Sequence, residues 1–357
     1  MHELKLGGNI LNELNKDFNL SFDLRYLNLE IWNSILEKCN YIPYLYTNSS
    51  IYYQELYRNK PNYEYIDLSS IINFKGEYVG LLNLGVCKMD DKYFIFSQSF
   101  NGQYEPPPVD KPIFINISER LEKKLSLQIL EIIKILSKML GVKEWRTVDN
   151  FDGNKNLSNW HLASMQFGSK SDIFYELFVD LRQNINTIKS KFRKSYKSLI
   201  YEEKYNLKTS VMNKNEQAVW SEFKNMHFIS AGRITRSDKS WKAHYDDIIN
   251  NCGILIYVRD SKGFFLGGGF FNYTRDEATY AVAAYDRSRF ELPIGHLVQY
   301  KAIREFQKKG IKWYKIGHLP FEGDEFTPSK KYLNIGNFKK GFATNIIPKY
   351  VFKNLNN

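Results

Sequence analysis

The order of apolar segments in the second half of the chain limits the fold more than any other feature of the sequence. Their spacing predicts two helices, three successive strands, a long helix and a final strand. In chain order these segments cover residues 216–228, 240–249, 253–259, 263–273, 278–284, 293–309 and 312–316. The long helix has Pro293 in its first turn and Gly310 at its end, the residues preferred at those places. This half is therefore predicted to be an α+β domain with a mixed sheet.

The same order is typical of acetyltransferase-type (GNAT) domains, and 357 residues are enough for two domains. In the first half, the pattern predicts helices at 30–39 and 121–140 and strands at 78–87, 93–96 and 171–180. A loop with Pro106, Pro107 and Pro108 lies between them, because proline disrupts helices and central strands. We predict two GNAT-like domains, a degenerate one at residues 1–170 and another at 171–357. The last strand is a candidate to pack back on the first domain.

Charge is distributed unevenly along the chain. Residues 1–180 contain 19 basic and 23 acidic side chains (net −4), whereas residues 181–357 contain 31 and 16 (net +15), which together give +11. Drift of an AT-rich coding sequence towards lysine would raise the charge of both halves alike. The asymmetry therefore favours a polyanionic partner for the second half, such as a nucleotide, a sugar nucleotide, coenzyme A or tRNA.

Several classes of protein are disfavoured. Cys39, Cys87 and Cys252 are far apart and form no CxxC, so neither a disulfide framework nor a zinc ribbon is expected. The apolar runs fall far short of the roughly 18 residues that span a bilayer, and the first residues lack a signal pattern. The six histidines show no metal-ligand spacing, and the Gly267–Gly269 run is no nucleotide-binding loop. We expect a cytoplasmic protein without a bound metal or cofactor.

Two basic segments are candidate anion-binding sites. Residues 181–200 read as a basic helix on which Lys189, Arg193 and Lys197 share one face, and a phosphate would offset their repulsion. A solvated linker helix is the alternative. Arg233 and Arg236 come shortly before a helix that Ser237 or Asp238 could cap, where a guanidinium would match a phosphate or carboxylate. Surface arginine pairs are also common without such a role.

A third candidate lies near the C-terminus, in the run Asn-Phe-Lys-Lys-Gly-Phe at residues 337–342. An ammonium held beside aromatic rings could stabilise an oxyanion or a phosphate in a partly dry site. The alternative is a lysine-rich hairpin turn between two strands, with Gly341 at positive φ.

Taken together, these segments resemble the FemAB-like superfamily. Its best-known members are aminoacyl-tRNA-dependent transferases that extend cell-wall peptide stems, and a broader branch of tandem acetyltransferase-fold proteins is linked to polysaccharide biosynthesis. The stretches that carry the resemblance are residues 175–200, 232–245, 278–317 and 337–342. It covers residues 170–350 well and the first half only loosely.

The resemblance implies a cleft between two halves and a role for each candidate residue. Lys339, beside Phe338, would stabilise the oxyanion that forms when an amine attacks an ester or thioester. Asp110 would be the general base, although the local pattern departs from that of the family. The residues implied in substrate binding are Arg236, Arg233, Lys189, Arg193 and Tyr285.

The donor implied by the resemblance is an aminoacyl-tRNA or an acyl-CoA, used as a substrate. Neither donor is indicated by a motif of its own. Residues 202–216 have no room for the coiled-coil arm of some tRNA-dependent members, and the pyrophosphate loop of acetyl-CoA users does not precede the helix at 293. We expect an acyl- or aminoacyltransferase that forms an amide on a phosphate-bearing cell-envelope or sugar precursor. The alternatives are an acyl-CoA-dependent N-acyltransferase of polysaccharide biosynthesis and a non-enzymatic, basic RNA-binding module.

Overall fold

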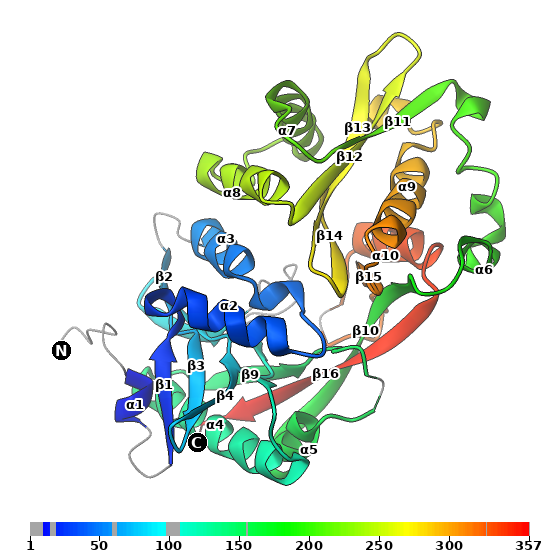
Figure 1. Ribbon diagram of the computed structural model, residues 1–357. Coiled ribbons are helices and arrows are strands. Elements are labelled where there is room, and N and C mark those ends of the chain that lie inside the picture. The colour runs from blue at the N-terminus through cyan, green and yellow to red at the C-terminus, as the bar shows by residue number, and fades with distance from the viewer. Residues whose placement is uncertain are drawn as a thin grey trace. The chain divides into compact units, whose positions relative to one another are not determined.

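The computed structural model describes residues 10–14, 19–58, 63–97, 108–154, 156–325 and 327–356 (Figure 1). The chain forms two compact units. The first contains Met1–Phe174 and Pro348–Asn357, and the second contains Tyr175–Ile347. The chain therefore returns to the first unit for its final residues.

The second unit is built on one mixed sheet with the strand order β11-β12-β13-β14-β15-β10. Neighbouring strands are antiparallel except for β14 and β15, which run parallel. The strands are β10 (Lys170–Asp180, from Tyr175 in this unit), β11 (Leu207–Met212), β12 (Gly253–Asp260), β13 (Phe265–Tyr273), β14 (Glu277–Tyr285) and β15 (Trp313–His318).

Helices cover both faces of this sheet because successive strand residues point to opposite sides. In β12, Leu255 and Tyr257 pack with the tryptophans of α7 and α8, whereas Ile254 and Ile256 pack with α9. The helices are α6 (Ile185–Lys191), α7 (Gln217–Ala231), α8 (Asp238–Ile249), α9 (Ile294–Lys308) and α10 (Lys330–Lys340), with short 3-10 turns η3 (Lys194–Tyr196), η4 (Glu203–Tyr205) and η5 (Arg287–Arg289). Both faces of the central strands are therefore buried.

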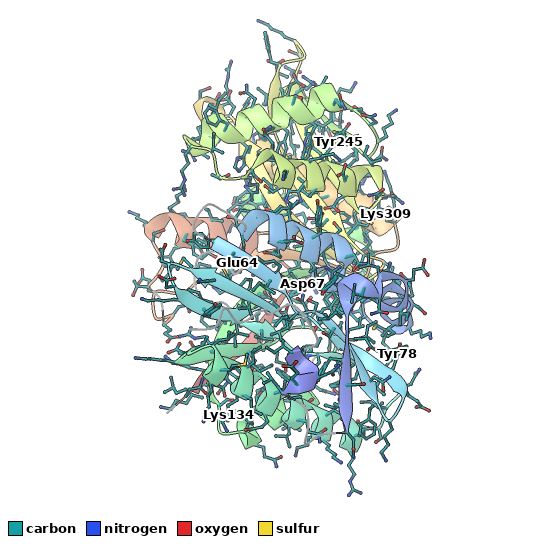
Figure 2. The ribbon with its side chains drawn as sticks, turned by 90° about the vertical axis from the view of Figure 1, so that its left-hand side faces the viewer. Glu64, Asp67, Tyr78, Lys134, Tyr245 and Lys309 are labelled. Atoms are coloured by element: carbon teal, nitrogen blue, oxygen red, sulfur yellow. The ribbon has the colours of Figure 1, made fainter. Side chains whose placement is uncertain are left out.

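The first unit contains smaller sheets around the long helix α4, whose Leu125, Ile129 and Ile133 are fully buried. Buried Arg25 pairs with Asp67, 2.7 Å away and labelled in Figure 2, which ties two distant segments together. Its elements are α1 (Ile10–Glu13), β1 (Leu20–Leu24), η1 (Arg25–Leu27), α2 (Leu29–Lys38), η2 (Tyr44–Tyr46), α3 (Asn48–Arg58), β2 (Tyr63–Asp67), β3 (Ser70–Phe74), β4 (Glu77–Leu82), β5 (Gly85–Met89), β6 (Lys92–Phe96), β7 (Val109–Asp110), β8 (Ile113–Phe114), α4 (Glu119–Met139), β9 (Glu144–Asp149), α5 (Asn159–Gln166) and β16 (Asn345–Leu355, from Pro348 in this unit).

The predicted class, α+β with two acetyltransferase-like units, is confirmed, and the seven segments predicted in the second half all form as expected. Ser237 caps α8, since its side chain accepts a hydrogen bond from the Ser240 N–H. The strand predicted at 78–87 is wrong. It is divided into β4 and β5, which belong to different sheets and are separated by buried Asn83.

The basic helix predicted at 181–200 is also wrong. The helix α6 ends at Lys191, and Phe192 has extended backbone angles and is buried against Tyr300 and Phe342. Burying this ring turns the chain out of the helical path, so Lys189, Arg193 and Lys197 do not share a helix face. Pro106 and Pro107 of the predicted loop lie outside the described residues.

Candidate active site

The parallel strands β14 and β15 separate within the second unit. Glu277–Thr279 pair with Trp313–Lys315, and no further pair joins these two strands in the part of the chain that the structure describes. Both strands nevertheless continue, β14 to Tyr285 and β15 to His318. Backbone groups along such an opening can hydrogen-bond to an extended ligand, as they do at an exposed sheet edge.

Helix α10 places Lys339 over this opening. Its Nζ lies 5.6 Å from the ring centroid of Tyr280 on β14. It also lies 2.6 Å from the position that a Cβ atom on Gly317 of β15 would occupy. Gly317 has a φ of +138°, which side-chain-bearing residues rarely adopt, so glycine supplies both the backbone conformation and the space for the lysine. The ammonium is therefore held between the two separating strands.

The electrostatic state of Lys339 is unusual. The side chain is half-buried, and its Nζ has neither a hydrogen bond nor an ion pair among the described residues. Burial lowers the pKa of Lys339 to about 8. A desolvated ammonium without a counter-ion attracts a developing negative charge more strongly than a solvated one does.

Two hydrogen-bonded side-chain pairs involve the partly buried Tyr280 and Tyr285 of β14 and the buried Tyr314 of β15. The hydroxyl oxygens of Tyr280 and Tyr285 are 2.7 Å apart, and the Tyr314 hydroxyl donates to Gln299 Oε1 over 2.6 Å. Burial raises the pKa of Tyr280 to about 12 and the pKa of Tyr285 well above its usual value. These hydroxyls are therefore proton-bearing donors at neutral pH, and they can orient a polar substrate group.

A bulge in β14 makes the Tyr280–Tyr285 contact possible. Residues five apart in a regular strand point to opposite faces. In the pairing with β13, however, Phe270 faces Val282 and Phe271 faces Tyr280, which leaves Ala281 without a cross-strand partner residue. Because the bulge adds one residue, the side chains of Tyr280 and Tyr285 point to the same face of the sheet, and their hydroxyls can meet.

Phe338 anchors the helix that carries Lys339. Its ring lies 6.0 Å from Tyr196, 5.1 Å from His296 and 5.4 Å from Phe342. Burial, with a smaller effect of nearby Arg193, lowers the pKa of His296 to about 4, so this histidine is neutral. Gly341 has a φ of −63° at the end of a helix, so the alternative of a hairpin turn is wrong.

Arg193 is occupied in positioning the same helix. Its guanidinium donates to the Asn337 carbonyl oxygen over 2.8 Å and to the Tyr196 hydroxyl over 3.2 Å, and its backbone N–H donates to the Gly341 carbonyl oxygen. These bonds satisfy carbonyls at the end of α10. Lys189 lies elsewhere, with its Nζ 3.3 Å from the Tyr201 hydroxyl. The structure thus gives Arg193 a positioning contact, and substrate binding by Arg193 and by Lys189 stays a prediction.

Arg233 and Arg236 follow α7, whose last turn contacts β14 through a hydrogen bond from Ser230 to the Tyr285 carbonyl oxygen. Arg236 Nη1 is 3.2 Å from His227 Nε2, and its guanidinium lies 5.6 Å from the Trp241 ring. Burial and the charge of Arg236 lower the pKa of His227 to about 4, which keeps that ring neutral. Arg233 is exposed. Their role as phosphate ligands stays a prediction.

Asp110 belongs to the first unit, where it is fully buried. Asn150 donates a hydrogen bond to its carboxylate, and Ser97 accepts one from its backbone N–H. Its role as a general base stays a prediction.

The sequence analysis missed Tyr280, Gln299, Tyr314 and Gly317. The bulge at Ala281 leaves no mark in the pattern, and buried tyrosines read simply as core. Gly317 directly follows the strand predicted at 312–316, and β15 continues past it to His318, so its place inside the strand was not predicted. No helix in the described ranges is long and apolar enough to cross a membrane, and no cluster of potential metal ligands occurs there.

No protein-family model matches the sequence, and no curated protein matches it. Similar folds are nevertheless found among solved structures. FemX superposes with a TM-score of 0.67 at 11% identity, over 92% of this chain and 96% of that chain. L-PGS from Bacillus licheniformis has a TM-score of 0.56 at 12% identity, over 92% of each chain.

A third similar structure is the C-terminal domain of a putative lysylphosphatidylglycerol synthetase from Agrobacterium fabrum. It has a TM-score of 0.51 at 11% identity, over 76% of this chain and 80% of that chain. At these identities the likeness is one of fold. The FemAB-like resemblance read from the sequence is therefore confirmed at the level of the fold, which this chain shares with FemX and L-PGS.

Proposed function

We propose that the protein is an acyl- or aminoacyltransferase that forms an amide on an amine of a phosphate-bearing cell-envelope or sugar precursor. The observation that carries this proposal is the Lys339 ammonium, which lies desolvated and unpaired within the described residues at the opening between β14 and β15. The fold shared with FemX and with L-PGS supports the same class of reaction.

The proposed step is attack of an acceptor amine on the carbonyl carbon of an activated ester. A carbon–nitrogen bond forms and the carbonyl oxygen becomes an oxyanion. When the carbonyl reforms, the carbon–oxygen bond to the leaving group breaks. The proton lost by the amine nitrogen balances the one gained by the leaving oxygen, so the group departs as an alcohol. Lys339 would donate to that oxyanion, since its ammonium needs no reorganisation as the charge develops. The ester is already activated, so positioning of the two substrates supplies much of the remaining acceleration.

The proposed donor is an aminoacyl-tRNA, and the alternative is an acyl-CoA. The separation of β14 and β15 supports the acyl-CoA alternative, because the extended, amide-bearing part of coenzyme A could hydrogen-bond to backbone groups between the two strands. Calorimetric titration with charged tRNA and with coenzyme A separates the two. Binding of uncharged RNA alone, without turnover of any acyl donor, would support the RNA-binding module instead.

The central test replaces the lysine. We expect Lys339→Ala to lower turnover at least tenfold, since removing one oxyanion-stabilising donor typically costs about 100-fold or more in rate. Turnover is followed by mass spectrometry of the amide product, with sugar-nucleotide acceptors and both donor classes.

Lys340→Ala is the matched control, because Lys340 is the next residue on the same helix and is exposed. It removes the same charge from the chain and should retain wild-type turnover. Unchanged turnover in Lys339→Ala, with an unchanged circular dichroism spectrum, would end the assignment.

A further inference from the structure

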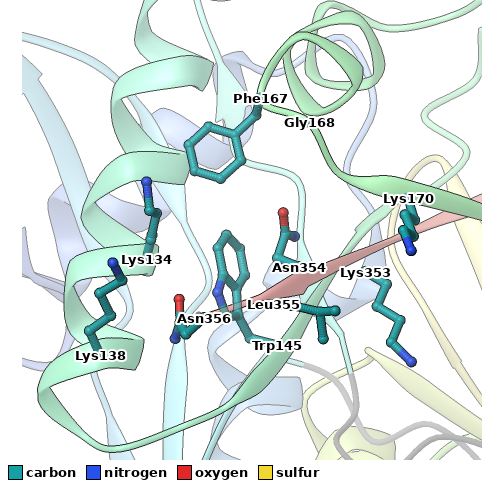
Figure 3. Close-up of a pocket in the computed structure, with 10 residues that line it drawn as sticks. All are labelled: Lys134, Lys138, Trp145, Phe167, Gly168, Lys170, Lys353, Asn354, Leu355 and Asn356. Carbon is teal, nitrogen blue, oxygen red and sulfur yellow. The ribbon is translucent and has the colours of Figure 1, made fainter.

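A second candidate site lies wholly within the first unit. A cavity of about 440 Å³ opens between the end of α4, the start of β9, the turn after α5 and the end of β16 (Figure 3). Its lining residues are Lys134, Lys138, Trp145, Phe167, Gly168, Lys170, Lys353, Asn354, Leu355 and Asn356. The volume suits a small ligand.

Positive charge dominates this cavity, because four lining residues are lysines and none is acidic. Lys138 and Lys170 are exposed and have no ion pair within the described part of the chain. Lys134, Lys138 and Lys170 belong to residues 1–180, whose net charge is −4, so these three do not follow from the composition of that half. Lys353 comes from the basic second half. Lys138 also lies in the last turn of α4, where any helix favours a cation, but Lys170 belongs to β10 and has no such reason to be there.

The other two lysines are partly neutralised. Lys134 Nζ lies 3.2 Å from Glu131, and Lys353 Nζ lies 2.9 Å from Glu144. Lys134 also lies 5.4 Å from the centre of the Phe167 ring, which forms an apolar part of the wall. The cavity therefore offers at least two uncompensated charges next to an aromatic surface.

A buried polar atom without a partner provides independent evidence for a ligand. Trp145 is 1% exposed, and its indole N–H has no acceptor among the described residues. Figure 3 shows its ring in the midst of the lining side chains, with Lys134 and Lys138 on one side and Asn354 on the other. Buried donors without partners are rare, since each costs about 1–3 kcal/mol.

We propose that this cavity binds a phosphate group carried by an organic molecule. Lysine ammonium groups are compact charges that suit phosphate oxygens, and the Trp145 N–H would supply a directional donor to the same group. Phe167 and the rim residue Leu355, which is 56% exposed, would contact the organic portion. This site is distinct from the Lys339 opening, which belongs to the second unit.

The test uses the full-length protein with tryptophan labelled by ¹⁵N. Inorganic pyrophosphate is the soluble probe, and the indole cross-peak that disappears in Trp145→Phe reports on this residue. We expect that peak to move on titration. The double variant Lys138→Gln/Lys170→Gln should weaken pyrophosphate binding at least tenfold. Lys38→Gln/Lys124→Gln is the charge-matched control, because both lysines are exposed residues of the same unit outside the cavity, and it should bind normally.

Vesicles distinguish the two sources of phosphate. A shift of the Trp145 peak with pyrophosphate supports a soluble organic phosphate. A shift only with phosphatidylglycerol vesicles, and not with phosphatidylcholine vesicles, supports a lipid headgroup. No shift with either probe, or equal binding by the Lys138→Gln/Lys170→Gln variant and its control, overturns the proposal.

Discussion

The charged form of Lys339 lowers the stability of the folded protein. Its ammonium loses hydration on folding and gains no counter-ion among the described residues, which is why burial lowers its pKa to about 8 from 10.5. Below pH 8 the folded protein must hold this unfavourable charge. Between pH 8 and 10.5 the unfolded chain still binds the proton that the folded protein has lost, so stability rises with pH there.

This linkage gives a prediction on stability. We expect Lys339→Met, which keeps the volume but removes the charge, to be more stable than the wild type at pH 7 by about 1–2 kcal/mol. The difference should persist below pH 8 and disappear as the pH approaches 10.5. Denaturant unfolding at pH 7, 9 and 10.5 measures it. A variant that is equally or less stable at pH 7 contradicts the desolvated state of the lysine.

At the scale of elements, the approach of α10 to β15 depends on Gly317. A Cβ atom there would lie 2.6 Å from Lys339 Nζ, and the φ of +138° is strained for any residue with a side chain. The lysine tip is flexible and would move aside, while the backbone would not relax so easily. The position of the ammonium is thus set by a glycine on a different element.

We therefore expect Gly317→Ala to lower turnover at least tenfold, as Lys339→Ala does, and to destabilise the fold by about 1–3 kcal/mol. Because both changes remove the same ammonium from the same place, the double variant should be no slower than Lys339→Ala alone. Gly323→Ala is the control, since a Cβ there meets open space. If the loss of turnover in the double variant equals the product of the two single losses, the two residues do not act through the same ammonium.

At the scale of the whole molecule, most of the last strand, β16, belongs to the same unit as residues 1–174. Tyr350–Leu355 of β16 pair antiparallel with Asp149–Glu144 of β9. Phe352 is fully buried in the core of the first unit, and Asn354 Oδ1 accepts a hydrogen bond from Ser169 over 2.6 Å. The first unit therefore requires residues from both ends of the sequence.

Phe352→Ala should accordingly destabilise the first unit by about 3–5 kcal/mol, the usual effect of emptying a buried phenylalanine site. Leu355→Ala, on the same strand but 56% exposed, should change stability by less than about 0.5 kcal/mol. Hydrogen exchange of the α4 amides reports the stability of this unit. Equal protection of those amides in the two variants would show that the last strand adds little to it.

Much of the second unit could be predicted because its patterns are local. The spacing of apolar residues, Pro293 before α9 and Gly310 after it each act within a few residues, so α7 to α9 and β12 to β15 were found close to their true limits. The first unit was predicted less well. Its short strands belong to several sheets, and the division between β4 and β5 depends on which partner strand each half finds.

The amino-acid order was sufficient for the α+β class, for the basic second half and for Phe338 and Lys339 as a candidate pair, because periodicity, charge and a short run of residues are local properties. The surroundings of Lys339 depend instead on β14, β15 and α10, which come together from distant parts of the chain. The bulge at Ala281, the space above Gly317 and the lysine cavity near Trp145 all arise from such long-range pairing. Contacts between distant segments produce no periodic pattern in the sequence, so these sites could be identified only from the tertiary structure.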